Sequence, residues 1–232
     1  MSAKTIALAL ASAIAFAASG AATAADRDHP AVVELFQSQG CSSCPPANAN
    51  VMALSDRPDL LTLSFGVTYW DQLGWKDTFA SPQYTARQWD YARALHHDDV
   101  FTPQVVVNGR ADVVGVRHGE IEALIAREDR GAGGPAIAAR GGKVVVGAAR
   151  TSRPAQVLLV RYDPNIVQVP IRRGENGGKT LPHRNVVKEL VSLGAWTGEA
   201  RAYSLPAARA GLKTAILVQA GPGGPILGAA RI

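Results

Sequence analysis

Cysteine is nearly absent from this chain. The 232 residues contain only Cys41 and Cys44, separated by two serines. No second Cys-x-x-Cys pair exists to complete a four-cysteine zinc site. There is also no third cysteine through which electrons could be relayed internally. A redox cycle on this pair therefore needs exchange with partners, which are a protein thiol or disulfide substrate and a redox partner.

Two further absences narrow the classes of function. The formal net charge is +5, but no run of Lys and Arg is longer than two residues. Nucleic-acid binding, which needs clustered positive charge, is therefore not expected. Beyond the N-terminal region no stretch is apolar for long enough to span a bilayer. We therefore predict a mature protein that associates with neither nucleic acid nor membrane.

The first 25 residues have the pattern of a secretory signal peptide. Lys4 precedes an apolar segment, residues 6–18, which is followed by the small-residue sites Ala22-Thr23-Ala24 and Thr23-Ala24-Ala25. Cleavage would leave Ala25 or Asp26 at the N-terminus. An uncleaved anchor is the alternative. The signal predicts a periplasmic or secreted location, where a disulfide persists.

Residues 26–130 alternate between strand and helix patterns. We expect strands at 31–36, 60–69, 100–107 and 111–116, and helices from the cysteines to Ser55, from Ser81-Pro82 to about 95, and over 119–127. Asn108-Gly109 is a strong hairpin signal. This is the element order of the thioredoxin fold. The first two strands, joined by a helix, should be parallel neighbours.

The sequence pattern changes after the linker at residues 131–135. Short β-type runs then alternate with Gly- and Pro-rich turns, at 143–147, 156–162, 166–171, 186–193, 214–218 and 226–230. The run 186–193 also fits a helical period. We predict an α/β protein with a thioredoxin-like domain at 26–130 and an antiparallel, sandwich-like β domain at 134–232.

The Cys-x-x-Cys turn is the main candidate for chemistry. Proline lacks an N–H, so Pro45 and Pro46 belong in the first turn of a helix, with Ser42 or Ser43 as the N-cap. The helix dipole then favours a thiolate, so Cys41 would attack and Cys44 would resolve the mixed disulfide. In the thioredoxin fold a cis-proline stands beside the cysteines at the place of Thr102-Pro103. An ordinary trans bond is the alternative.

The chain resembles a family of secreted bacterial proteins named after a domain of unknown function, number 1223. The matching residues are Glu34 to Phe36, Gln39 to Pro46, Tyr69 to Asp71, Leu73 to Asp77, Tyr84, Arg87-Gln88, Tyr91, Thr102 to Gln104, Asn176-Gly177 and His183 to Val187. The resemblance implies a thioredoxin-fold domain with an added β domain, and it implies no established activity.

Other residues are weaker candidates. Glu34 is nearest to the buried acid of thioredoxin, although a one-residue offset would put it on the opposite face of its strand. Trp70 and Trp75 could form an apolar rim for a peptide substrate, or pack in the core. His183 could approach the thiols or cap a turn.

Two classes of function remain open at this point. The first is an extracytoplasmic thiol–disulfide oxidoreductase that needs no cofactor. The second is a binding protein on a thioredoxin scaffold, with Cys41–Cys44 as a static disulfide. A metal site that adds His96, His97 or His183 to the cysteines is a further alternative, but a structural zinc site normally has paired ligand spacings, so we predict no bound metal.

Overall fold

The computed structural model describes residues 24–232. The predicted signal peptide, residues 1–25, lies almost entirely outside this range. Within the described part of the chain, no helix is long and apolar enough to cross a membrane.

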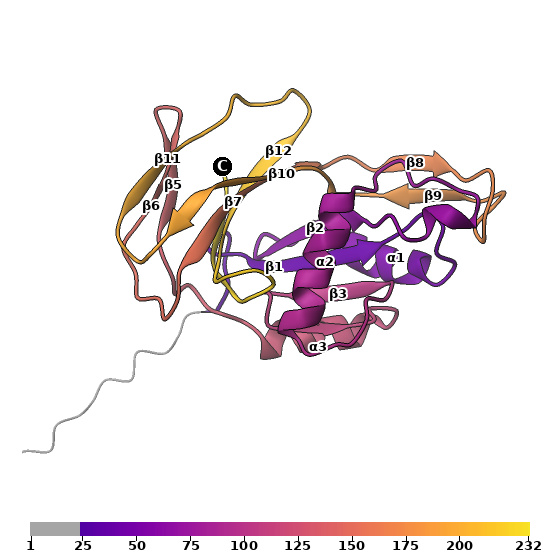
Figure 1. The fold of residues 1–232 in the computed structure, drawn as a ribbon, viewed down its shortest axis with the longest axis horizontal. Helices are drawn as coiled ribbons and strands as arrows, with labels where there is room; N and C mark the ends of the chain where they lie inside the picture. Colours follow the sequence, from indigo (N-terminus) through magenta and orange to yellow (C-terminus); the bar gives the residue numbers. More distant parts are fainter. Residues whose placement is uncertain (1–23) are drawn as a thin grey trace, which may run out of the picture.

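The first half follows the predicted alternation of strand and helix (Figure 1). Its elements are β1 (Ala31–Gln37), α1 (Cys44–Leu54), β2 (Leu60–Gly66), the short 3-10 helix η1 (Asp71–Leu73), α2 (Pro82–Ala94), β3 (Gln104–Val107), β4 (Ala111–Val113) and α3 (His118–Arg127). Ser81 caps α2 by accepting a hydrogen bond from the Gln83 amide, at 3.3 Å. β1 and β2 are parallel neighbours, which confirms that prediction.

The second half consists of strands. They are β5 (Ile137–Arg140), β6 (Lys143–Val146), β7 (Ala155–Asp163), β8 (Val167–Pro170), β9 (Thr180–His183), β10 (Val186–Trp196), β11 (Arg201–Ser204), β12 (Lys213–Gln219) and β13 (Ile226–Arg231). The ambiguous run at 186–193 is therefore strand and not helix. The sequence does not predict the short strands β5, β9 and β11, because they lack a clear apolar run.

One sheet runs through both halves. Its eight strands lie in the order β13-β12-β7-β10-β2-β1-β3-β4, so four strands of the second half extend the sheet of the first. The junction is narrow: β10 is parallel to β2, with Val186 opposite Ser64, and the Ser64 amide donates to the Asn185 carbonyl at 2.9 Å. The fold is mixed α/β, with a sheet that is mostly antiparallel.

Helices cover the two faces of β1 differently because its side chains alternate. Val33 and Leu35 pack in one core with residues of α1 and α3. Val32 and Phe36 pack in another core with Tyr84 and other residues of α2, and that core continues onto β7 and β12. A three-stranded sheet, β11-β6-β5, packs on the other face of β7 and β12.

The division into folding units 26–130 and 134–232 stays a prediction. The shared sheet and the shared core around α2 lead us to expect that each unit exposes apolar surface when it is alone. Separate expression of the two segments is the measurement that tests the division. Two soluble, folded segments would support it, and aggregation of both would contradict it.

The hairpin β8–β9 leaves the large sheet and lies beside α1 (Figure 1). Asn48 in α1 holds it there, since its Nδ2 donates to the Pro182 carbonyl at 2.5 Å. Val169, Ile171 and Leu181 form a small apolar core there, and Trp75 and Phe79 of the first half pack against it. Residues of the second half are thereby brought to the N-terminal end of α1, where the two cysteines lie.

Candidate functional site

Cys41 and Cys44 form a disulfide at the start of α1, with their Cα atoms 5.5 Å apart. Cys44 is the first helical residue and Ser43 is the N-cap, as one of the two predicted serines, while Pro45 and Pro46 lie in the first turn. The prolines fix the helix start because they lack the N–H groups that a helix leaves unpaired there. The dipole of α1 therefore points its positive end at the pair.

The Ser43 hydroxyl faces Cys41 instead of capping its own helix. Its Oγ lies 3.3 Å from the Cys41 Sγ and 3.4 Å from the Thr102 carbonyl oxygen. In the disulfide state the hydroxyl can donate to that carbonyl. In the reduced state it can donate to a Cys41 thiolate instead. The sequence indicated Ser43 only as an N-cap candidate and did not indicate this contact with Cys41.

The Thr102–Pro103 segment lies against Cys41, as the sequence predicted. Its peptide bond is cis, and the Thr102 carbonyl oxygen is 3.8 Å from the Cys41 Sγ. Trp70 holds the threonine in place, because its indole Nε1 donates to the Thr102 Oγ1 at 2.7 Å. The structure thus brings Cys41, Cys44, Thr102, Pro103 and Trp70 together.

Trp75 and Asp77 hold the turn that leads into the cysteines. The Trp75 indole donates to the side-chain Oε1 of Gln39 at 2.9 Å. The Asp77 carboxylate accepts from the backbone N–H of Gln39 at 2.7 Å. Burial raises the pKa of Asp77. Both predicted tryptophans therefore hydrogen-bond to residues beside the cysteines, Trp70 to Thr102 and Trp75 to Gln39. Their role toward a substrate stays a prediction.

Glu34 lies on the opposite face of β1, away from the cysteines. Its carboxylate, which is fully buried, binds the Arg87 guanidinium at 2.8 and 3.0 Å. Tyr91 donates a further hydrogen bond to the same carboxylate. Glu34 thus does not join the site, and the one-residue offset places it in a buried ion pair between β1 and α2.

Residues of the loop between β8 and β9 hydrogen-bond to the backbone of the Cys-x-x-Cys turn. The Asn176 Nδ2 donates to the carbonyl oxygens of Gln39 and Cys41, at 3.0 and 2.9 Å. The Glu175 carboxylate accepts from the Ser42 amide at 2.9 Å. Cys41 is 0% exposed and Cys44 1%. We call the segment 172–179 the latch, because its side chains tie the hairpin to the Cys-x-x-Cys turn.

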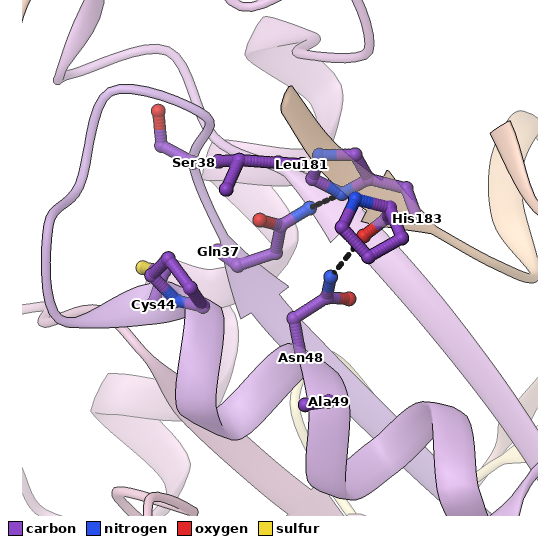
Figure 2. Close-up of a pocket in the computed structure, with 9 residues that line it drawn as sticks. Gln37, Ser38, Cys44, Asn48, Ala49, Leu181 and His183 are labelled. Carbon is purple, nitrogen blue, oxygen red and sulfur yellow. Dashed lines mark hydrogen bonds between the residues drawn. The ribbon is translucent and has the colours of Figure 1, made fainter. Parts of the chain in front are cut away.

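A small cavity lies behind Cys44. Its volume is about 30 Å³, enough for a water molecule. Gln37, Cys44, Asn48 and His183 are among its lining residues, and Figure 2 shows Gln37 and Asn48 pointing toward β9 with Cys44 at the far edge. His183 therefore does approach the pair from the second half of the chain.

His183 is buried and neutral at pH 7. Its burial lowers its pKa to about 4, and the positive charge of Lys188 acts in the same direction. The Gln37 Nε2 lies 3.1 Å from the His183 Nδ1. The other ring nitrogen of His183, Nε2, has no hydrogen-bond partner among the described residues. A buried, unpaired ring nitrogen is costly unless a water molecule satisfies it. The cavity can hold that water.

The other histidines considered as metal ligands lie at the end of α2. His97 pairs with Asp112 at 3.0 Å, and the neighbouring His96 is exposed. Within residues 24–232, no three side chains of His, Cys, Asp or Glu are grouped so that they could hold a metal ion.

Replacing Ser43 by alanine should make the pair more reducing, since the hydroxyl donates to a neutral carbonyl in the oxidised state and to a charged thiolate in the reduced state. A hydrogen bond to a charged group contributes about 1.5–3 kcal/mol and one to a neutral group about 1 kcal/mol, so the difference is about 0.5–2 kcal/mol. For a two-electron couple this corresponds to a potential more negative by about 10–40 mV. Ser42→Ala is the matched control, because the exposed Ser42 does not contact either sulfur. Equal potentials in the two variants would contradict this role of Ser43.

Comparison with solved structures finds two similar chains, of which one is also similar in sequence. A crystal structure of a protein from Agrobacterium tumefaciens is 32% identical, with a TM-score of 0.72, and the match covers 90% of this chain and 94% of that one. HBP35 of Porphyromonas gingivalis is 11% identical with a TM-score of 0.55, over 88% of this chain and 75% of that one, and so is similar in fold alone. No curated protein matches the chain.

The family model described as a protein of unknown function, DUF1223, matches residues 32–219. This range includes the disulfide, the cis-proline segment, the latch and His183. The chain therefore belongs to the DUF1223 family.

Proposed function

We propose that this protein is a thiol–disulfide oxidoreductase whose first half is a thioredoxin-like domain. The observation that carries the proposal is the Cys41–Cys44 disulfide at the N-terminus of α1, with the Thr102 carbonyl and the Ser43 hydroxyl beside Cys41. Helix N-termini and hydrogen-bond donors stabilise thiolates, which are the reactive form in exchange. The element order from β1 to α3 also supports the proposal.

Exchange on the oxidised pair needs two steps. A substrate thiolate attacks the Cys41 Sγ, the Cys41–Cys44 bond breaks, and its electron pair goes to the Cys44 sulfur, which takes up a proton. A second substrate thiolate then attacks the substrate sulfur of the mixed disulfide, and Cys41 leaves as a thiolate. The substrate gains a disulfide and the pair gains two electrons. Run in reverse, the same steps reduce a substrate disulfide.

Labelling after mild reduction tests the proposal. Cys41 should react with a thiol probe many-fold faster than Cys44, since only Cys41 has the Ser43 donor beside it. Equal and slow labelling of both cysteines would instead favour a binding protein with a static disulfide. The complete burial of both residues is the observation that favours this second candidate.

Access to Cys41 requires the latch to move. Asn176 makes two hydrogen bonds to the turn, each of which contributes about 1 kcal/mol. Asn176→Ala should therefore shift the hairpin toward an open state and speed reduction of the disulfide by dithiothreitol by up to roughly thirty-fold, the factor that corresponds to about 2 kcal/mol. Asn165→Ala, in the exposed turn before β8, is the matched control. A rate equal to that of the control would show that the latch does not limit access.

The location outside the cytoplasm is part of the proposal. It rests on the signal pattern of residues 1–25, which predicts a mature protein that starts at Ala25 or Asp26. Mass spectrometry of the protein from its native cells checks this. A soluble cytoplasmic product that retains Met1 would be the contrary result.

A further inference from the structure

A cavity of about 270 Å³ lies between the end of α1, the start of β2 and the turn from β9 to β10. Cationic side chains from five separate segments line it, together with a single carboxylate, Asp56. The five are Arg27, Arg57, Arg184, Lys213 and Arg231. The whole chain carries a formal charge of only +5, so this is a strong local concentration of positive charge, and it is brought together only by the fold.

Two of these cations have carboxylate partners. Arg57 pairs with Asp59 at 2.6 Å and with Glu122 at 2.8 Å. Arg184 pairs with Asp56 at 2.6 Å. Their charge is thus largely balanced within the protein.

Lys213 and Arg231 differ, because neither forms an ion pair within the described residues 24–232. Arg231 donates instead to the carbonyl oxygens of Pro58 and Leu60, which are uncharged. The charge of Lys213 contributes, after the larger effect of Arg184, to the lowered pKa of Asp56. Arg27 likewise forms no ion pair in this part of the chain, so three cations without a carboxylate in contact line the same cavity. The nearest acids, Asp56 and Asp59, feel the charges of Lys213 and Arg231 but are paired with Arg184 and Arg57. An anion would stabilise this arrangement.

Polar side chains at the cavity are already fixed by hydrogen bonds. Thr62 and Asn185 are buried, and the Asn185 Nδ2 donates to the Thr62 Oγ1 at 2.7 Å. Ser55 Oγ lies 2.9 Å from the same Thr62 oxygen. This network joins the first half of the chain to the second beside the β2–β10 junction, and it gives the cavity a pre-formed wall. Pre-formed sites bind with a smaller entropic cost.

We propose that this cavity binds a phosphate-type oxyanion, with Lys213 and Arg231 as its main charged contacts. An ammonium group and a guanidinium group together complement the several oxygens of such an anion. Residues of both halves of the chain line the cavity, and a ligand that binds only the folded state stabilises it. The site is independent of the redox chemistry proposed above.

Calorimetric titration of the full chain with inorganic phosphate, at constant ionic strength, tests the proposal. We expect saturable binding with a dissociation constant of about 1 mM or tighter. Lys213→Gln and Arg231→Gln should each weaken it at least about five-fold. Lys143→Gln, an exposed lysine in β6, makes the same change of charge elsewhere and should leave the affinity unchanged.

A second titration, with glycerol phosphate, shows which kind of phosphate the cavity prefers. Glycerol phosphate that binds more tightly than inorganic phosphate would indicate a phosphomonoester, and equal affinities would indicate the free ion. The absence of saturable binding up to about 20 mM phosphate, some twenty-fold above the expected constant, would overturn the proposal. So would binding that both Lys213→Gln and Arg231→Gln leave as tight as in the Lys143→Gln control.

Discussion

Replacing Arg87 by alanine should destabilise the protein by about 3–5 kcal/mol, because the mutation leaves a buried carboxylate without its cation. The Arg87 Nε and Nη2 donate to the Glu34 carboxylate, and the Nη1 donates to the Gln219 Oε1 at 2.9 Å. Glu34 is 0% exposed and Arg87 is 7% exposed. The three residues also join β1, α2 and β12, so the loss would be felt in both halves of the chain.

Urea unfolding of Arg87→Ala and Arg93→Ala measures this effect. Arg93 lies in the same helix and pairs with Asp90, but its side chain is 64% exposed, so its removal should cost less than about 1 kcal/mol. The double variant Glu34→Gln/Arg87→Met, which removes both charges, should recover part of the loss. Equal costs for the two arginines would show that the Glu34–Arg87 pair is not the feature that matters.

Acidification from pH 6.5 to 4 should cost the folded state about 3 kcal/mol through His183 alone. Burial lowers the pKa of His183 from 6.5 to about 4. Between these values the unfolded chain binds a proton that the folded chain does not. Stability therefore falls as the pH falls through this window, and the contribution levels off below pH 4.

Carboxylates also titrate in this pH range, and the variant His183→Gln separates the contribution of His183 from theirs. The free energy of unfolding of the wild type should fall more steeply over the window than that of the variant. His118→Gln is the control, since the His118 side chain is 48% exposed and its variant should follow the wild type. An NMR titration that gives His183 an ordinary pKa near 6.5 would contradict the prediction.

Local chemistry made several features predictable from the sequence. Two prolines after a Cys-x-x-Cys set the start of α1 at Ser43 and Cys44, because a helix start is where missing N–H groups cost nothing. Asn108 and Gly109 have φ values of 50° and 61° at the turn between β3 and β4, a backbone that these residues accept readily. Such signals depend only on near neighbours in the chain.

Contacts between residues far apart in the chain were predictable only where the element order of a known fold implies them, as for Thr102 and Cys41. Asn176 is separated from Cys41 by 135 positions, and its amide bonds depend on where the β8–β9 hairpin packs. The available signals were a polar Asn-Gly in a glycine-rich turn and its place among the residues that match the family, and neither indicates contact with Cys41. Likewise, an apolar strand such as β7 shows that it is buried but does not show which strands flank it. The continuous sheet therefore appears only in the fold.

The reduction potential of the Cys41–Cys44 pair, measured by equilibration with glutathione, tests the central claim most directly. Redox-active Cys-x-x-Cys pairs have potentials of about −270 to −120 mV, whereas structural disulfides lie below about −300 mV. The helix N-terminus and the Ser43 donor, which both favour the reduced thiolate, predict a value in the first range. A potential below about −300 mV would contradict the proposed exchange and identify the disulfide as structural.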